Sequence, residues 1–454
     1  RVVMTAPDVL RSAVMAHRAG QTQDAKRAYD QILAADPCNG WANYLRSILA
    51  DEEGEPALAL ACLRRAAQAP EPPVQSLIAL GNRELAERAF EAALAAFTRA
   101  EELRPLMAAA VVGKTLALKR IGRFDQALVA AQRALFLRRS WQAGSPNPPG
   151  ELDPADIEQM RRTNRVKLTH DAAQIRHLHR QGILDSGYLQ IAQAYEDLAA
   201  GYHHLPHDTT IAALDDTALA ATQFAYNRLI HLPETGRAAG DALSIDTDFS
   251  SVDAQYADTH PAPVVIDNVL SPDALFKLQR LCRDATIWFE VKDHGGHIGA
   301  YFEEGLGCDL LVQITEALRR RLPRSLGHLS LAQLWAYKHV QGGSGTDYHA
   351  DIGQVSANLW ITADDASLDQ DGGGLEIWPV EMPAGWDFHK ANIDRAGIRS
   401  LLATSPVQPV NIPHRCNRLV LFDANLFHRT SPGRFAEGYS QQRVNITFLY
   451  DRPA

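Results

Sequence analysis

The stretch LIALGNRELAERAFEAALAAFTRAEELRP, residues 77–105, sets the pattern of the N-terminal third of the chain. Within it, the small residues Ala93 and Ala100 flank the larger Phe97, and Pro105 follows the last apolar position. Spacings of three and four residues place side chains on one face of a helix. Because proline cannot continue a helix, the stretch predicts a helix that ends before Pro105 and packs through its small residues.

The same pattern returns at a fixed period along the chain. Four positions of the pattern recur at an even spacing. They are occupied by Ala25, Ala59, Ala93 and Ala127; by Tyr29, Leu63, Phe97 and Ala131; by Ile32, Ala66, Ala100 and Ala134; and, in the turn, by Gly20, Gly54 and Gly122, with Arg88 in the remaining place. This period, with its turn glycine and terminal proline, resembles the tetratricopeptide repeat (TPR), whose unit is about 34 residues long. The resemblance implies a solenoid of helix pairs whose groove binds peptides or partner proteins. An Ala-rich helical bundle is the alternative.

Length and composition bound the rest of the chain. Its 454 residues, 46% hydrophobic and 22% charged, are typical of a soluble chain of two or three domains. The sequence contains no apolar run of about 18 residues, so we expect no membrane span. Five scattered cysteines without a CxxC motif argue against a disulfide scaffold or a cysteine zinc site. Together with the absence of a signal-peptide pattern at the start, they predict a cytoplasmic protein.

Charge is distributed unevenly. Residues 1–150 hold 19 Lys and Arg against 15 Asp and Glu, whereas residues 151–454 carry a net charge of −13. A phosphate backbone requires a cationic surface, so the acidic part argues against a nucleic acid partner.

Breaks in the pattern predict three regions. The cluster GSPNPPG, residues 144–150, cannot be crossed by a helix and ends the TPR-like repeats of residues 1–143. Residues 144–260 read as a linker and helical middle segment, with helices over 155–162, 171–181 and 188–200 and an irregular acidic stretch over 236–260. Residues 261–454 switch to short apolar runs that predict a helix capped at Ser271 and strands over 264–268, 331–339, 355–361, 375–378, 417–422 and 443–450. We therefore expect an α+β multidomain protein that ends in a β-sandwich or jelly roll with flanking helices.

Three residues of the last region stand out as metal ligands. His349 and Asp351 are two apart on a predicted strand, so both side chains point to one face, and His428 follows much later in the chain. Two imidazoles and one carboxylate form the facial triad of non-haem Fe(II) oxygenases. One HxD pair is expected by chance in a chain with 17 histidines, so ordinary strand histidines are the alternative.

The final predicted strand supports a site of this kind. In RVNITFLY, residues 443–450, the polar residues Arg443, Asn445 and Thr447 share one face. A buried polar face that includes arginine is costly unless it lines a cavity that holds an anion. Arginine offers a bidentate fork to a carboxylate. A structural ion pair is the alternative role for Arg443, and Arg434, in a turn region, is expected to face solvent.

Together these motifs resemble a known enzyme family. The strings Tyr348-His-Ala-Asp351, Gly372-Gly-Gly-Leu375, Asn417–Phe422, His428 and Arg443–Thr447 are similar, in order and spacing, to the prolyl-hydroxylase-like branch of the 2-oxoglutarate/Fe(II)-dependent dioxygenases. The resemblance implies a double-stranded β-helix (jelly roll) in which His349, Asp351 and His428 hold Fe(II). It implies that Arg443 binds the distal carboxylate of 2-oxoglutarate, and it marks Tyr337, Asn358 and Thr447 as further residues of the cosubstrate pocket. Collagen-type members carry lysine in place of Arg443, which weakens any specific comparison with them.

The implied reaction consumes dioxygen and 2-oxoglutarate and hydroxylates a C–H bond. We expect the substrate to be a side chain of a protein or peptide that the repeats recruit. A small metabolite, with the repeats serving assembly, and a non-catalytic TPR adaptor are the alternatives. Two stretches have no assigned role: residues 292–307, interpreted as a mobile lid or a surface loop, and the insert 379–411, which could shape substrate access. The other histidines of the region (His294, His297, His339, His389 and His414) are predicted to lie in loops or at the surface.

Overall fold

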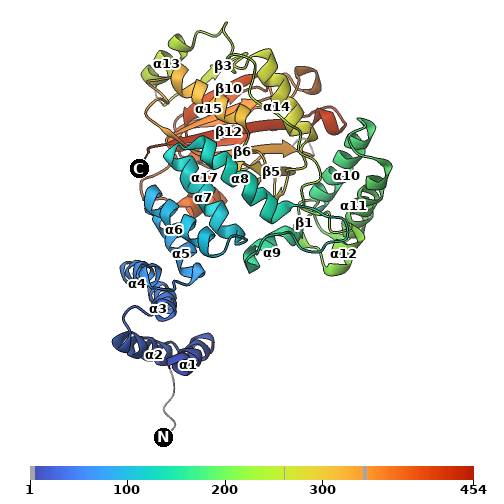
Figure 1. Ribbon diagram of the computed structural model, residues 1–454. Helices are drawn as coiled ribbons and strands as arrows, with labels where there is room; N and C mark the ends of the chain where they lie inside the picture. Colours follow the sequence, from blue (N-terminus) through green and yellow to red (C-terminus); the bar gives the residue numbers. More distant parts are fainter. Residues whose placement is uncertain (1–5, 260, 341–344, 454) are drawn as a thin grey trace. The chain divides into compact units, whose positions relative to one another are not determined.

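A computed structural model describes residues 6–259, 261–340 and 345–453 (Figure 1). The chain divides into two compact units, one that ends at Ala130 and one that runs from Ala131 to Pro453. The boundaries that the sequence places after residues 143 and 260 stay predictions.

The first unit consists of helices that pack on their neighbours in chain order. Corresponding helices begin at equal intervals, in agreement with the period of the sequence. Their bounds are α1 (Ala6–Arg18), α2 (Thr22–Ala35), α3 (Gly40–Glu52), α4 (Pro56–Gln68), α5 (Val74–Ala86), α6 (Phe90–Leu103), α7 (Ala108–Ile121) and α8 (Phe124–Arg139), the last of which continues into the second unit.

The repeat residues occupy the positions that the period predicts. The alanines Ala25, Ala59, Ala93 and Ala127 are fully buried. The turn residues Gly20, Gly54, Arg88 and Gly122 all have positive φ, between 63° and 87°. The Phe97 ring lies against Gly113, where an added Cβ would lie 2.2 Å from Cε1 of the ring. This unit is therefore a solenoid of TPR-like helix pairs, as the sequence predicts.

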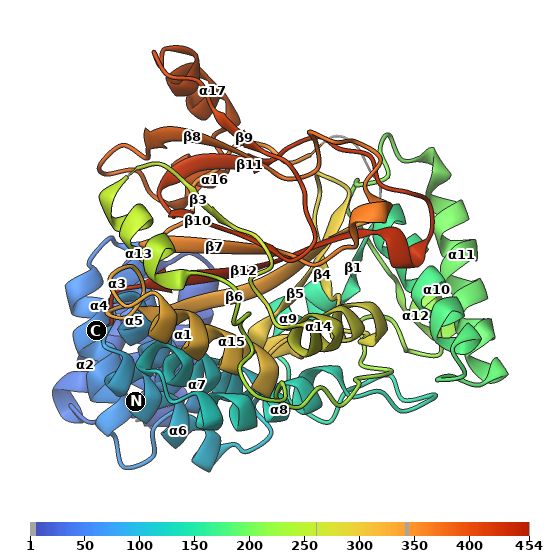
Figure 2. The same cartoon turned by 90° about the horizontal axis from the view of Figure 1, so that it is seen from above.

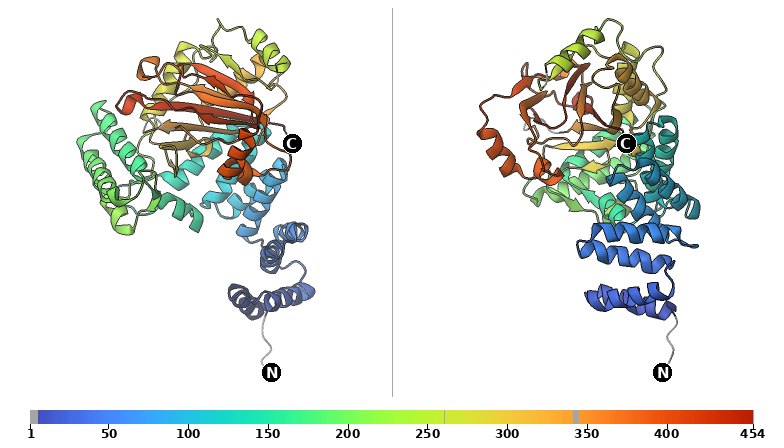
Figure 3. Two further views of the ribbon diagram at one scale, coloured as in Figure 1. Left: turned by 180° about the vertical axis from the view of Figure 1, so that it is seen from behind. Right: turned by 90° about the vertical axis from the view of Figure 1, so that its left-hand side faces the viewer.

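The second unit opens with helices and continues into sheets. Its first helices are α9 (Pro154–Arg161), α10 (Arg165–Arg180), α11 (Leu189–Gly201), α12 (Asp216–Ala221) and α13 (Phe249–Asp258), with short 3-10 turns η1 (Ser186–Tyr188) and η2 (Tyr202–His204). The two-residue strands β1 (Arg162–Thr163) and β2 (Ala212–Ala213) pair with each other. Helices α10 and α11 pack as a pair at one end of the strands (Figure 3). The stretch 236–260, expected to be irregular, contains α13.

Two antiparallel sheets form the centre of this unit. A seven-stranded sheet has the order β3-β10-β7-β12-β6-β5-β4, and a three-stranded sheet has the order β11-β8-β9. The strands are β3 (Val264–Ile266), β4 (Glu290–Val291), β5 (His297–Tyr301), β6 (Ser330–His339), β7 (Val355–Trp360), β8 (Leu375–Glu381), β9 (Val410–Ile412), β10 (Arg418–Asp423), β11 (Leu426–Thr430) and β12 (Arg443–Asp451).

An apolar core joins the two sheets. Residues from both sheets contribute to it: Trp360, Val420 and Phe422 from the larger, and Leu375, Ile377, Ile412 and Leu426 from the smaller. Helices α14 (Pro272–Asp284) and α15 (Asp309–Arg321) lie on the opposite side of the larger sheet (Figure 2). The Ser271 side chain accepts a hydrogen bond from the Ala274 amide, so it caps α14 as predicted. The remaining short elements are η3 (Phe302–Glu304), η4 (Asp364–Ala366), α16 (Phe388–Asn392), α17 (Arg395–Ala403) and η5 (Tyr439–Gln441).

The structure corrects three expectations. Residues 292–307 do not form a lid or a surface loop, because most of β5 within them is buried in the larger sheet. His297 is buried in β5, with 3% of its area exposed, and His339 is half-buried in β6, so neither lies in a loop or at the surface; His414 lies in the loop between β9 and β10 but is buried, with 9% of its area exposed. The His349–Asp351 segment is not a regular strand: His349 makes one isolated bridge, to His428. In the described part of the chain, no helix is long and apolar enough to cross a membrane.

Candidate active site

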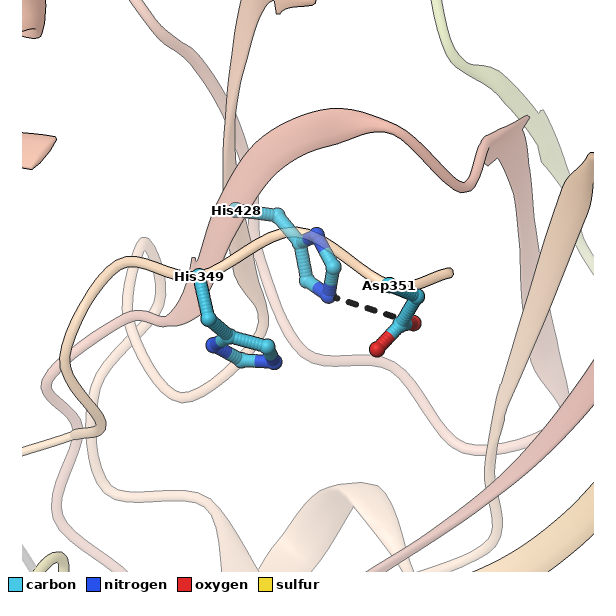
Figure 4. Close-up of side chains that lie close together, drawn as sticks. All are labelled: His349, Asp351 and His428. Atoms are coloured by element: carbon cyan, nitrogen blue, oxygen red, sulfur yellow. Dashed lines mark ion pairs between the residues drawn. The ribbon is translucent and has the colours of Figure 1, made fainter. Parts of the chain in front are cut away.

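The side chains of His349, Asp351 and His428 converge on one point (Figure 4). One ligand atom from each lies within 4.8 Å of the other two, and the Nε2 atom of His428 lies 3.7 Å from an Asp351 oxygen. His428 is buried and the other two are half-buried. Among the described residues, this is the one cluster of three or more His, Cys, Asp or Glu side chains with metal-ligand spacing.

Backbone hydrogen bonds bring the two ligand-bearing segments together. The His349 amide donates to the His428 carbonyl at 3.0 Å, and the His428 amide donates back at 2.8 Å. The Asp351 amide donates to the Ala424 carbonyl at 2.8 Å. These three bonds align residues that are far apart in the sequence, although the segment forms no continuous ladder.

Both imidazoles are oriented for metal binding. Nδ1 of His349 lies 3.0 Å from the Asp347 carbonyl, and Nδ1 of His428 lies 2.9 Å from the Leu426 carbonyl. Because a carbonyl only accepts, each Nδ1 carries a proton, and in the neutral form of either ring Nε2 keeps the lone pair that can bind a metal. Burial, reinforced by His349 and opposed by Asp351, lowers the pKa of His428 to about 4, so this imidazole is neutral at pH 7. Two imidazoles and a carboxylate suit a divalent iron ion.

A second set of contacts holds the flanks of the two histidines. Tyr348, which precedes His349, hydrogen-bonds to Glu376 of β8. Arg429, which follows His428, donates to the same carboxylate at 2.7 and 2.9 Å, and its guanidinium lies 4.5 Å from the centre of the Tyr348 ring. Glu376 thus connects both ligand segments. The sequence places Glu376 next to the glycine turn but gives no signal of this role.

Arg443 is a buried cation without a carboxylate partner in the described part of the chain. Its side chain donates to the Gly373 and Gly374 carbonyls and, at 2.7 Å, to the Asn445 side chain. Only 2% of the residue is exposed, and burial lowers the pKa of its guanidinium to about 9. Arg434, by contrast, is exposed and binds Asp369 through two nitrogens. The arginine that can receive an anion is therefore Arg443.

The other predicted pocket residues have partners of their own. The side-chain amide of Asn358 donates to Thr447 at 2.8 Å, and Trp360 donates to Asn358 at 2.7 Å. These contacts favour a structural role for Asn358 and Thr447. The Tyr337 ring lies against Gly299 of β5, and its centre is 5.6 Å from the Lys292 nitrogen.

A cavity of about 330 Å³ opens beside Arg443. Three of its lining residues carry buried polar atoms without a hydrogen-bond partner in the described part of the chain: His339 Nε2, Ser431 Oγ and Gln442 Oε1. The metal-ligand side chains do not line it, but Thr430 does, two residues beyond His428. His339 lies directly opposite Arg443 on β6. Sequence reasoning missed it, although its alternation with Trp335 and Tyr337 places all three on one face.

No family model matches the chain, and no curated protein matches it. Among solved structures, it is similar to YrrB, described as a TPR protein with an unusual peptide-binding site (20% identity, TM-score 0.27, covering 29% of this chain and 67% of that one). It is also similar to pilF of Pseudomonas aeruginosa (17%, 0.27, 48% and 80%) and to an O-GlcNAc transferase of Thermobaculum terrenum (23%, 0.26, 37% and 35%). TM-scores this low assign no function to the chain.

Proposed function

We propose that the second unit is an Fe(II)- and 2-oxoglutarate-dependent hydroxylase, and that its substrate is a side chain of a protein or peptide held by the repeat solenoid. The observation that carries the proposal is the convergence of His349, Asp351 and His428, with Nδ1 of each histidine held by a backbone carbonyl. The strand order of the two sheets supports it, because two facing antiparallel sheets are the framework of a jelly roll.

Arg443 and the cavity beside it suit a dicarboxylate cosubstrate. Arg443 offers a guanidinium that no protein carboxylate neutralises in the described residues, and the cavity beside it has unsatisfied polar atoms. A distal carboxylate there would accept charge-assisted hydrogen bonds from Arg443. These features together match 2-oxoglutarate better than a neutral metabolite.

The bound iron would supply the site at which dioxygen is reduced. In the overall reaction, 2-oxoglutarate loses carbon dioxide to give succinate, one oxygen atom enters succinate, and the other enters the substrate C–H bond as a hydroxyl. The chain would contribute geometry: His349, Asp351 and His428 would hold the iron, and Arg443 would bind a carboxylate of the cosubstrate.

A non-catalytic adaptor is the second candidate. The observation that favours it is the repeat solenoid itself, because stacked helix pairs bind partners through their surfaces without chemistry. A metabolite hydroxylase, in which the repeats serve assembly, stays a further alternative.

The deciding experiment measures succinate formed from 2-oxoglutarate by protein loaded with Fe(II) under air. We expect turnover with the wild type and none with Asp351→Ala, which removes the carboxylate ligand. A matched control is Asp369→Ala, which removes a half-buried carboxylate from an ion pair with the exposed Arg434. A wild type that binds no metal and forms no succinate would favour the adaptor. A mass gain of about 16 on peptides, but not on metabolite pools, would support a peptide substrate.

A further inference from the structure

The insert between β8 and β9, residues 382–409, lies against the segments that carry the metal ligands. It contains the helices α16 and α17, and α17 stands beyond β8 and β9 in Figure 2. Side chains of Asp387 and Asp394 cap the two helices by accepting from the Lys390 and Gly397 amides, both at 2.9 Å. The insert is therefore an ordered structure.

Polar contacts join the insert to the HxD segment. The Ala350 amide, between His349 and Asp351, donates to the Ala391 carbonyl at 3.1 Å. The Ala350 carbonyl accepts from the Asn392 side chain at 3.0 Å. Both backbone groups of Ala350 thus bind to the end of α16. Nearby, Arg395 pairs with Asp347 at 2.9 Å.

Apolar contacts extend this attachment to the third ligand. Ala350 and Phe427, which directly precedes His428, belong to one buried cluster with Ala391, Ile398 and Leu402 of the insert. Trp386 meets the Phe427 ring edge-on, with 6.0 Å between the ring centres. The insert core therefore touches a direct neighbour of every metal ligand.

We infer that the 382–409 insert is the positioning element of the metal centre, and that Asn392 is its main positioning residue. This inference rests on the proposed function, because it presumes that the cluster binds metal. The physical reason is that the HxD segment has one isolated bridge and no ladder. Its backbone must be fixed by other groups, and Asn392 and Ala391 supply the bonds on the side of the insert.

A metal-affinity measurement tests the inference without any turnover. The dissociation constant of Co(II), used as the probe, is measured for the wild type, Asn392→Ala and the isosteric Asn392→Asp, which cannot donate to Ala350. Loss of groups that orient metal ligands weakens metal affinity by about 10- to 100-fold. We therefore expect the dissociation constant of Co(II) to rise at least about 10-fold in both variants. The matched control is Asn411→Ala, which removes an asparagine bond of the same type, to the Asp371 carbonyl at 2.8 Å, from a strand that carries no metal ligand.

Limited proteolysis of the wild type supplies the reciprocal readout. Coupling between metal and insert must act both ways, so Co(II) should slow tryptic cleavage at the exposed Lys390, Arg395 and Arg399. If circular dichroism shows that the Asn392 variants do not fold, protection of the wild type from cleavage is the measurement that tests the positioning role. Asp351→Ala should show no protection.

The outcomes separate the two proposals. If the wild type binds Co(II), and the folded Asn392 and Asn411 variants bind it with equal affinity, the positioning role is overturned. The proposed metal site then still stands. The positioning role is also overturned if the Asn392 variants do not fold and Co(II) leaves the rate of tryptic cleavage of the wild type unchanged. Absence of Co(II) binding by the wild type overturns the proposed function itself.

Discussion

Replacement of Arg443 by glutamine tests whether the buried guanidinium binds a ligand. The residue is 2% exposed, donates to two carbonyls and one amide, and pairs with no carboxylate in the described part of the chain. Loss of one partner from a buried, hydrogen-bonded charge pair costs about 2–5 kcal/mol. If 2-oxoglutarate supplies the other charge, its dissociation constant should rise by about 30- to 5000-fold in Arg443→Gln.

The assay is calorimetric titration of 2-oxoglutarate into Co(II)-loaded protein, with Arg434→Gln as control. Arg434 is 72% exposed at its side chain and already paired with Asp369, so its loss should leave affinity unchanged. The cosubstrate should also raise the melting temperature of the wild type, but not that of Arg443→Gln, by mass action.

The stability of the metal-free protein separates a binding role from a structural one. Breaking a buried ion pair costs about 3–5 kcal/mol of unfolding free energy, because one charge is left without its partner. Arg443 pairs with no protein carboxylate in the described residues, so Arg443→Gln should lose no more than about 1 kcal/mol. Unchanged affinity for 2-oxoglutarate together with a loss of that larger size would refute the reasoning and make Arg443 a structural residue.

Three further predictions concern stability, each checked by denaturant unfolding followed by circular dichroism. Gly113→Ala should destabilise the repeat unit by about 1–3 kcal/mol, because its Cβ would lie 2.2 Å from an atom of the Phe97 ring. Glu304→Gln should cost about 3–5 kcal/mol, because the carboxylate accepts from Arg138 and Arg139 at 2.8 and 2.6 Å in a buried site; an unchanged midpoint would contradict this. Burial holds the pKa of His414 at about 4, below its unfolded value of about 6.5. The unfolded chain therefore binds the proton first, and between pH 7.5 and 5 this residue should account for about 2 kcal/mol of lost stability. His414→Gln should reduce that loss by the same amount.

The repeat unit was predictable because its information is local. Ala93 and Phe97 are four residues apart on one helix, and the period repeats that relation. The long strands β6, β7, β10 and β12 were predictable for a similar reason, since an alternating or continuous apolar run marks each of them. The family resemblance of the second unit implied which residues meet at the metal cluster, and the structure brings those three together.

Other features depend on contacts that no local pattern records. The β5 strand follows a pair of glycines and reads as a loop until β6 supplies its hydrogen bonds. Likewise, the loop residue His414 is buried because it stacks on Trp360 of β7, with 5.8 Å between the ring centres. The insert helices are short, and their packing partners Ala350 and Phe427 lie outside the insert. These elements are fixed by tertiary contacts, so the pattern of neighbouring residues in the sequence does not predict them.

The cluster of His349, Asp351 and His428 shows why such contacts matter for the proposed metal site. A facial triad needs three side chains held at fixed separations, yet one of its segments makes a single bridge rather than a ladder. The structure compensates from two directions: Glu376 holds the residues beside both histidines on one side, and Asn392 holds the residue between His349 and Asp351 on the other. A segment without a ladder can shift when its neighbours shift. Mutations in the insert should therefore change metal affinity before they change the unfolding of the sheets, an order that parallel measurements of Co(II) binding and denaturant unfolding can establish.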